Sequence, residues 1–490
     1  MTTITLPIDP KHFWAIVALA GFVLAVAVVY AAMPRSEGKH TDPLDRLKDI
    51  LGLGQFGDGL FLLLALMWSG LFLALFTGLL LMLWELIWFV VPQNPLAEAS
   101  ARFALLRLAA MTATLGAVVA LPFTLIRIRL TREANKTADE SLFNDKINAA
   151  TEDLHAMRQR WDEEQKQNIW EDDITRRNAA IDRLEGLVKE RPDTAPRVSR
   201  LLSVYVRELS REVPPEIPPE DVATKELRTW AQGLTVKRSD MENAVQVLGR
   251  MRSIDGVDPN RITIDLREAN LQGFDLSKLR LQGALFVNAR MQGTCLHRAQ
   301  IQNASLCGAH LQSADLSWAR VQNATFTEAQ MQEAVLNGAY MERTRFVDAD
   351  MQGAQLYEAS MHGANLSWAT LEQAYLRKAR LQGSRLVGTR MRDANLSEAQ
   401  FDQSTTLDYA DFSNSLLNQL NFTKVRISHE QLASGFGTLG TILPDGSGPD
   451  SPNWPGHWPR HKMTSNVARQ QWKKWQTDPD NYIPPTAPDE

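Results

Sequence analysis

The chain has 490 residues, with 52 Lys and Arg against 57 Asp and Glu, so its formal net charge is −5 at pH 7. This length allows several domains, and the mildly negative charge gives no indication of a nucleic-acid partner. Two cysteines, Cys295 and Cys307, are too few for a disulfide framework and fit a reducing compartment.

Three apolar stretches predict a membrane domain over residues 1–126. They lie at about 13–33, 60–91 and 103–126, and each reaches the roughly 20 residues that a helix needs to cross the hydrocarbon layer. A cleaved signal peptide is an alternative for the first stretch, although its apolar run is longer than the ~7–15 residues of a signal core. The lipid bilayer is therefore an expected partner of the chain.

Lysine and arginine residues predict how these spans are oriented. The loop after the first span and the segment after the third are rich in both, whereas the leader holds only Lys11 and the loop before the third span only Arg102. Positively charged loops stay on the cytoplasmic side of a membrane. We therefore expect a multi-pass protein with its N-terminus outside and its C-terminal domain in the cytoplasm.

Residues 127–261 predict a cytoplasmic helical region. Apolar positions near its start step by three and four residues, the spacing of a coiled-coil seam, but for only about two and a half heptads. The seam consists of Phe143, Ile147, Ala150, Leu154, Met157 and Trp161. Two interpretations stay open: a homodimer through this helical linker, or packing within the same domain. Further amphipathic helices are expected near 172–189, 195–211, 221–232 and 240–252.

A period of five residues governs the segment 262–426. Counting in fives from Leu266 to Phe401 gives 28 positions, each of them Leu, Met, Phe, Ile or Val, and Ala stands two residues earlier in 21 of the 28 cases. Residues two apart on an extended chain face the same way, so each such pair points inward and the chain then turns a corner. Four sides close a square coil of twenty residues. Stacked coils form a β-solenoid about 38 Å long at roughly 4.8 Å per layer.

This repeat resembles a known family. Stretches such as "ADLSWARVQNATF" and "ANLSEAQF" are similar to the pentapeptide-repeat motif A-(D/N)-L-X-X over about residues 264–425. The resemblance implies an all-β right-handed quadrilateral β-helix after the N-terminal transmembrane helices and the helical linker. The order of parts, with "AVQVLGRM" just before the repeats, resembles bacterial membrane-anchored members. That likeness implies the bacterial inner (cytoplasmic) membrane as the location and names no activity.

The outward positions of the repeat carry their own patterns. Glutamines twenty residues apart are expected to stack as two ladders in which side-chain amides bond from layer to layer. One ladder would hold Gln272, Gln292, Gln312, Gln332 and Gln352, and the other Gln282, Gln302 and Gln322. Trp318 and Trp368 are expected to point outward on opposite faces, where each either covers a neighbouring residue or contributes to an interface.

No pattern in the sequence predicts a catalytic, cofactor-binding or metal-binding residue. Two cysteines and two histidines match the composition of a zinc site, but the five-residue register places them on opposite faces of the coil. These are Cys295, His297, Cys307 and His310. The chain also lacks a glycine-rich phosphate loop, a nucleophile elbow and a metalloprotease motif. We therefore expect no cofactor and no enzymatic activity.

Three functions remain compatible with this architecture. Some pentapeptide-repeat proteins resemble DNA and bind DNA gyrase, which requires an acidic rod, but residues 265–426 hold 16 acidic and 16 basic side chains. The preferred prediction is a membrane-tethered scaffold or interaction protein that binds another protein and no nucleic acid. The alternatives are a topoisomerase-binding DNA mimic and a purely structural spacer.

The C-terminal tail, residues 427–490, is rich in tryptophan and proline. Trp454, Trp458, Trp472 and Trp475 are too many aromatic residues for a disordered segment. The open edge of the last coil would otherwise invite association with another edge. We therefore expect the tail to fold back and cap the solenoid.

Overall fold

The structure is a computed structural model that describes residues 43–53, 56–85, 87, 98–219 and 224–486. The predicted first span, 13–33, lies outside the described residues. The chain divides into two compact units, residues 1–145 and 146–490.

Among the described residues of the first unit, two helices are long and apolar enough to cross a membrane. Helix α2 (Pro43–Leu51) precedes α3 (Asp58–Glu85), in which residues 59–85 form one candidate span. Helix α4 (Glu98–Asp153) contains the other and continues well past residue 126, where the sequence predicted the end of the third span. The helix passes through Pro122 without ending, so the apolar segment and the polar segment after it form one element.

The end of α4 corrects the predicted coiled-coil seam. Ile147, Ala150 and Leu154 are buried, but the chain then forms a hairpin of β1 (Met157–Asp162) and β2 (Gln167–Asp172). Met157 and Trp161 lie on this hairpin and are 45% and 56% exposed. Residues four apart share a face in a strand as well as in a helix, so the apolar spacing alone could not distinguish the two.

The remaining helical region is a small bundle. Its long helices are α5 (Ile174–Glu190), α6 (Ala195–Glu212) and α8 (Ser239–Met251), and the short elements are η3 (Pro192–Thr194), α7 (Thr224–Gln232) and η4 (Pro259–Arg261). Apolar side chains on one face of each long helix, among them Ile181, Leu202 and Val245, are fully buried between them. This agrees with the amphipathic spacing of the segments.

The predicted β-solenoid follows the bundle. Parallel bridges join residues twenty positions apart, from Asp265 with Leu285 to Arg380 with Gln400. One extra residue after Phe401 then shifts the register, so that Arg385 pairs with Thr406. The apolar centres and the alanines before them are buried inside.

The solenoid extends beyond its predicted end at residue 426. Strand β3 (Leu416–Leu417) pairs in parallel with β4 (Phe436–Gly437), and helix α9 (His429–Ala433) lies between them in the chain. Gly437 therefore occupies the inward column that Leu417 occupies one coil earlier. A Cβ atom at Gly437 would lie 2.4 Å from the Trp458 ring, so the indole fills the space of the missing side chain. The five-residue pattern could not reveal a coil whose centre is a glycine.

Helices α6 and α8 cover the first coil. On each of its four sides, a backbone N–H that would bond to a preceding coil donates instead to a group of these helices. The pairs are Asp265 N to Ser203 Oγ (3.3 Å), Asn270 N to Ser210 Oγ (2.9 Å), Asp275 N to Glu242 Oε1 (2.7 Å) and Arg280 N to Gly249 O (3.3 Å). The edge therefore offers no free donor on these four sides for pairing with another strand.

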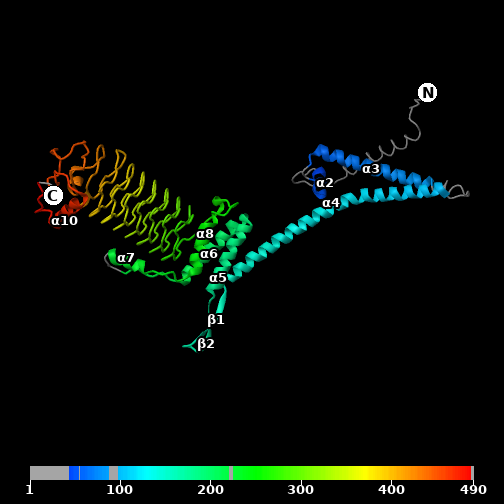
Figure 1. The fold of residues 1–490 in the computed structure, drawn as a ribbon, viewed down its shortest axis with the longest axis horizontal. Helices are drawn as coiled ribbons and strands as arrows, with labels where there is room; N and C mark the ends of the chain where they lie inside the picture. Colours follow the sequence, from blue (N-terminus) through cyan, green and yellow to red (C-terminus); the bar gives the residue numbers. More distant parts are fainter. Residues whose placement is uncertain (1–42, 54–55, 86, 88–97, 220–223, 487–490) are drawn as a thin grey trace, which may run out of the picture. The chain divides into compact units, whose positions relative to one another are not determined.

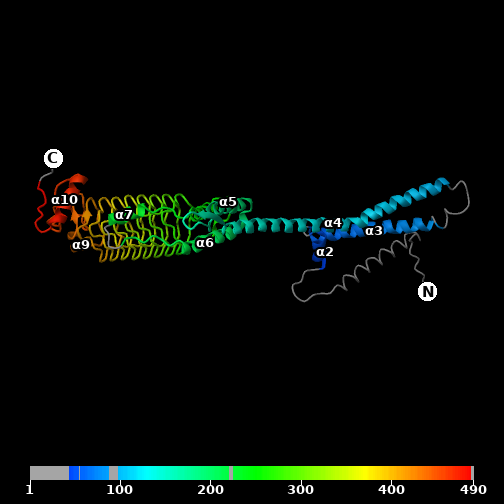
Figure 2. The same ribbon diagram turned by 90° about the horizontal axis from the view of Figure 1, so that it is seen from below.

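The tail packs on the last coils. Trp472 and Trp475 of helix α10 (Ser465–Thr477) cluster with Leu416 and Phe436, and the Trp472 indole donates to the Asn414 carbonyl at 2.7 Å. Figure 2 shows the stacked coils between the helical bundle at one end and α9 and α10 at the other.

The cap contains a titratable group with a predictable effect on stability. His457 stacks on Trp475 with ring centroids 4.9 Å apart and hydrogen-bonds to the Gly435 carbonyl at 2.8 Å. Burial lowers the pKa of His457, and the bond to Gly435 opposes this only in part. The unfolded chain therefore binds the proton at a higher pH than the folded chain does. The contribution of neutral His457 to the stability of the folded chain is therefore fully present above the unfolded pKa of about 6.5. It decreases as the pH falls below that value.

We expect the thermal unfolding temperature of the full chain in detergent to fall between about pH 7.5 and pH 5.5. His457→Phe keeps a ring on Trp475 and removes the titratable group. The unfolding temperature of this variant should therefore change less with pH over the same range. Some slope should remain, because burial also lowers the pKa of His310. Equal slopes in the two proteins would contradict the role given to His457.

Candidate functional site

A groove on one outer face of the solenoid is the candidate site. We call this face the third face, since it is formed by side chains that flank the centres at 336, 356, 376 and 396, the third side of successive coils. The groove has a volume of about 620 Å³. Its floor and walls include Asn337, Gln355, Tyr357, Tyr375, Arg377, Asn395 and Ser397.

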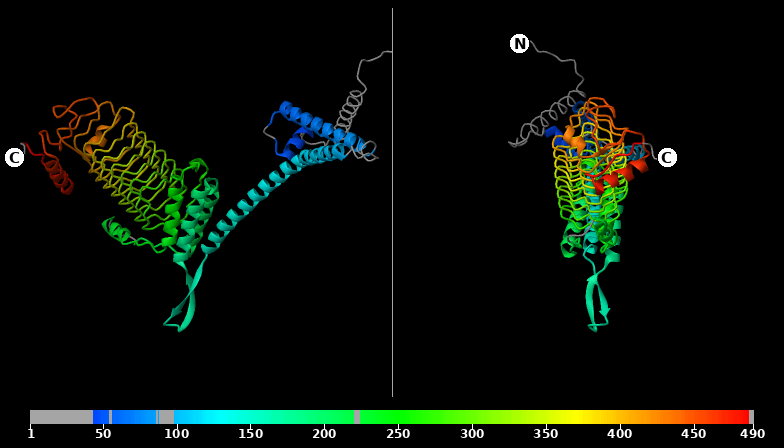
Figure 3. Two further views of the ribbon diagram at one scale, coloured as in Figure 1. Left: turned by 45° about the vertical axis from the view of Figure 1, so that its right-hand side comes forward. Right: turned by 90° about the vertical axis from the view of Figure 1, so that its left-hand side faces the viewer.

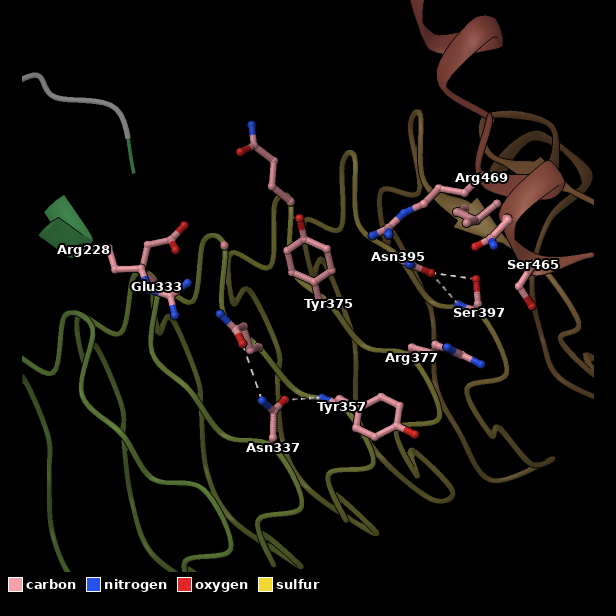
Figure 4. Close-up of a pocket in the computed structure, with 15 residues that line it drawn as sticks. Arg228, Glu333, Asn337, Tyr357, Tyr375, Arg377, Asn395, Ser397, Ser465 and Arg469 are labelled. Carbon is pink, nitrogen blue, oxygen red and sulfur yellow. Dashed lines mark hydrogen bonds between the residues drawn. The ribbon is translucent and has the colours of Figure 1, made fainter. Parts of the chain in front are cut away.

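Two helices bound the groove at its two ends, because both pack along the same corner of the solenoid. Near the first coils α7 approaches so closely that a Cβ atom at Gly293 would lie 2.4 Å from the Ala231 carbonyl oxygen. Near the last coils Gln476 of α10 donates to Asp393 Oδ1 at 3.0 Å. Between the helices the corner stays open. Figure 4 shows Arg228 of α7 at one end and Arg469 of α10 at the other.

Hydrogen bonds hold the floor of the groove in place. Asn337 Oδ1 accepts from the Tyr357 backbone N–H at 2.9 Å, and its Nδ2 donates to Gln355 Oε1 at 3.5 Å. Asn395 Oδ1 accepts from both the backbone N–H and the hydroxyl of Ser397, at 3.0 and 2.7 Å. These side chains are therefore fixed before any ligand arrives, which lowers the entropy cost of binding.

The walls of the groove combine aromatic rings with positive charge. Tyr375 is 47% exposed and Tyr357 38%. Lys378 lies outside the groove, and its Nζ is 5.8 Å from the centroid of the Tyr357 ring. The interaction with Tyr357 raises the pKa of Lys378. Arg377 pairs with Glu398 at 2.7 Å.

The two end arginines differ from Arg377. Among the described residues, neither Arg228 nor Arg469 forms an ion pair, and Glu333 is the one acidic side chain that lines the groove. The groove is thus suited to an extended segment that carries aromatic and acidic side chains.

The solenoid is similar to a known protein family. The family model for pentapeptide repeats matches residues 264–405 in eight copies. The chain contains a pentapeptide-repeat domain. Comparison with the curated proteins finds no match.

Solved structures with the same repeat are similar to this domain. HetL, a pentapeptide repeat protein involved in heterocyst differentiation regulation from the cyanobacterium Nostoc sp. strain PCC 7120, is 27% identical. The match covers 38% of this chain and 92% of HetL, with a TM-score of 0.27. Full-length QnrB1, a plasmid-mediated fluoroquinolone resistance protein, is 16% identical, with 43% and 98% covered and a TM-score of 0.27. A pentapeptide repeat protein from the Arabidopsis thaliana thylakoid lumen is 23% identical, with 24% and 67% covered and a TM-score of 0.11.

The glutamines of the pentapeptide repeats bond differently from the prediction. Gln272 Nε2 does donate to Gln292 Oε1 at 3.1 Å, twenty residues on. The other glutamine–glutamine bonds within the described solenoid run to a residue eighteen positions on, which lies before the next centre of the same face. They join Gln282 to Gln300, Gln312 to Gln330 and Gln382 to Gln400, at 2.7 to 2.9 Å. Among the described residues the predicted twenty-residue ladder is thus present at one pair, and the other bonds join neighbouring coils diagonally.

The outward tryptophans of the pentapeptide repeats each cover a glycine in the next coil. A Cβ atom at Gly338 would lie 2.7 Å from the Trp318 ring, and one at Gly388 would lie 2.4 Å from the Trp368 ring. Of the two interpretations that the sequence left open, the structure favours packing against a neighbouring residue. Glycine twenty residues after a tryptophan was the signal that sequence reasoning overlooked.

The cysteines and histidines do not converge. Cys295 pairs by backbone with Asp275 and Asp315 on the third face, and burial raises the pKa of its thiol. His310 lies beside Arg290 on the preceding face of the coils. Within the described residues no group of three or more potential metal ligands occurs.

Proposed function

We propose that the chain is a non-enzymatic, membrane-tethered scaffold whose pentapeptide-repeat rod binds a segment of a protein in the third-face groove. The observation that carries this proposal is the groove itself, with a fixed polar floor, exposed tyrosines and an arginine at each end. A rigid solenoid whose two edges are covered by its own helices supports the role of a docking platform.

Membrane tethering is the second part of the proposal. Large apolar side chains on α3 and α4, such as Leu66, Leu106 and Phe123, are exposed, which is expected of helices that face lipid. We place the chain in the bacterial inner membrane, with the N-terminus outside and the rod in the cytoplasm, because the distribution of lysine and arginine supports this orientation.

Two alternatives predict different behaviour. A topoisomerase-binding DNA mimic would need a strongly acidic surface, whereas the repeats carry equal numbers of acidic and basic side chains. A purely structural spacer would bind nothing in the groove.

Photocrosslinking in membranes tests the proposal. A photoreactive phenylalanine at Tyr375 should capture a specific protein adduct, because this side chain points into the groove. The same residue at Tyr340, which is on a neighbouring face and similarly exposed at 42%, is the matched control. No adduct from Tyr375, or the same adducts from both positions, would refute binding in the groove and favour the spacer.

A further inference from the structure

The β1–β2 hairpin has an exposed aromatic face without a partner in the described structure. Gln159 pairs with Trp170 and Trp161 with Asn168, so both indoles lie on the same side of the two strands. Trp161 is 56% exposed and Trp170 63%. Figures 1 and 3 show the hairpin projecting away from helices α5, α6 and α8. An isolated two-stranded hairpin is only marginally stable in water, so a partner on this face would stabilise it.

The tip of the hairpin is acidic. The Asp162 carboxylate holds the turn by accepting from the backbone N–H groups of Glu164 and Gln165, each at 2.9 Å. The carboxylates of Glu163 and Glu164 are exposed, and in the described part of the chain neither forms an ion pair. Two negative charges without an ion pair in the described structure therefore lie at the tip, two and three residues after Trp161.

The groove is complementary to this hairpin in chemistry and in size. At its ends it offers Arg228 and Arg469, which form no ion pair with any described residue, and between them Tyr357 and Tyr375 (Figure 4). The four coils that form it span about 14 Å at roughly 4.8 Å per layer, and the two strands of a hairpin lie about 4.8 Å apart. Indole and phenol rings pack well against each other, and the acidic tip of the hairpin is opposite in charge to the arginine at either end of the groove.

We infer that the third-face groove of one copy receives the β1–β2 hairpin of a second copy. This inference rests on the proposed function, because it names the protein segment that the groove binds. Both halves of the contact are present in every molecule, so two copies can exchange hairpins and form a closed pair with two equivalent contacts. Self-association of the helical linker, one of the two interpretations that the sequence left open, would then use Trp161 on a hairpin and not on a coiled coil.

A charge swap in the full chain in detergent tests the inference. The hairpin variant carries Glu163→Arg and Glu164→Arg, and the groove variant carries Arg228→Glu and Arg469→Glu. Mass determination by light scattering should find a dimer for the parent chain. For each variant alone, the dissociation constant of the dimer should rise by at least ~10-fold, because like charges then meet in both contacts. An equimolar mixture should recover the dimer, because each arginine-bearing hairpin meets a glutamate-bearing groove and each original hairpin meets an original groove.

The control variant is Glu328→Arg with Asp348→Arg, two exposed acidic residues on another face, and it should dimerise like the parent. A monomeric parent chain, or a mixture that stays monomeric, would overturn the inference. If Tyr375 then still captures a different protein in membranes, the proposed function stands without the self-association. If Tyr375 captures nothing, both fail.

Discussion

Replacement of Asp240 by Asn is expected to lower the free energy of unfolding of the 146–490 unit by about 3–5 kcal/mol. Asp240 is fully buried at the start of α8. Its carboxylate accepts from the Tyr205 hydroxyl at 2.7 Å and from the Arg238 guanidinium at 2.6 and 3.0 Å. Burial opposes ionisation, but these hydrogen bonds outweigh it and hold the pKa of Asp240 below its ordinary value. The neutral amide would leave Arg238 without its closest counter-charge.

The effect of Asp240→Asn should extend to the hairpin. Arg238 also donates to Asp172 Oδ2 at 2.7 Å, and Arg177 donates to the other oxygen of Asp172 at 2.5 Å. Asp172 is the last residue of β2. The network therefore links α5, α6 and α8 to the base of the hairpin, and its loss should loosen all four elements together.

Hydrogen exchange of α6 and α8 amides in the full chain in detergent measures this loss. Glu208→Gln is the matched control, because Glu208 pairs with Arg211 on the surface, where an ion pair contributes at most about 1 kcal/mol. The network would not have the role given to it if Asp240→Asn exchanged no faster than Glu208→Gln.

The solenoid was predictable because its signal is repeated in every coil. A fixed period constrains which residues face inward, so Leu266 and Phe401 could be assigned to one core from the sequence alone. The spacing of apolar residues was not sufficient where a short segment fits the period of a helix and the period of a strand. Met157 and Trp161 fit a helix and a strand equally well, and the Asp162 turn that decided between them is a single local feature.

The groove could be predicted only in part. Its floor follows from the register, since Asn337, Tyr357 and Arg377 are twenty residues apart and must lie in one column. Its ends depend on where α7 and α10 pack, and neither helix carries a pattern that specifies its position on the rod. Gly293 makes room for α7, but a glycine at a corner position is also ordinary turn chemistry, as its φ of 65° illustrates.

Replacement of Trp458 by Ala is the second change with a large expected effect, about 3–5 kcal/mol of unfolding free energy. The indole is 1% exposed, packs edge-on against Trp454 at 5.1 Å, and donates to the Gly435 carbonyl at 2.8 Å. Gly437 provides no side chain. Truncation of Trp458 therefore leaves a cavity inside the last coil of the solenoid that no neighbouring residue can fill.

Thermal unfolding of the full chain in detergent compares this variant with Trp318→Ala. Trp318 also covers a glycine, but its ring remains 46% exposed on the outer surface, so its loss should cost much less. If Trp458 closes the end of the solenoid, Trp458→Ala should also increase concentration-dependent association, because the loosened last coil exposes an unpaired edge. Loss of stability without such association would mean that α10 alone covers the edge of the last coil and that Trp458 only fills the interior of that coil. Equal stability of the two variants would show that the last coil does not depend on the indole at all.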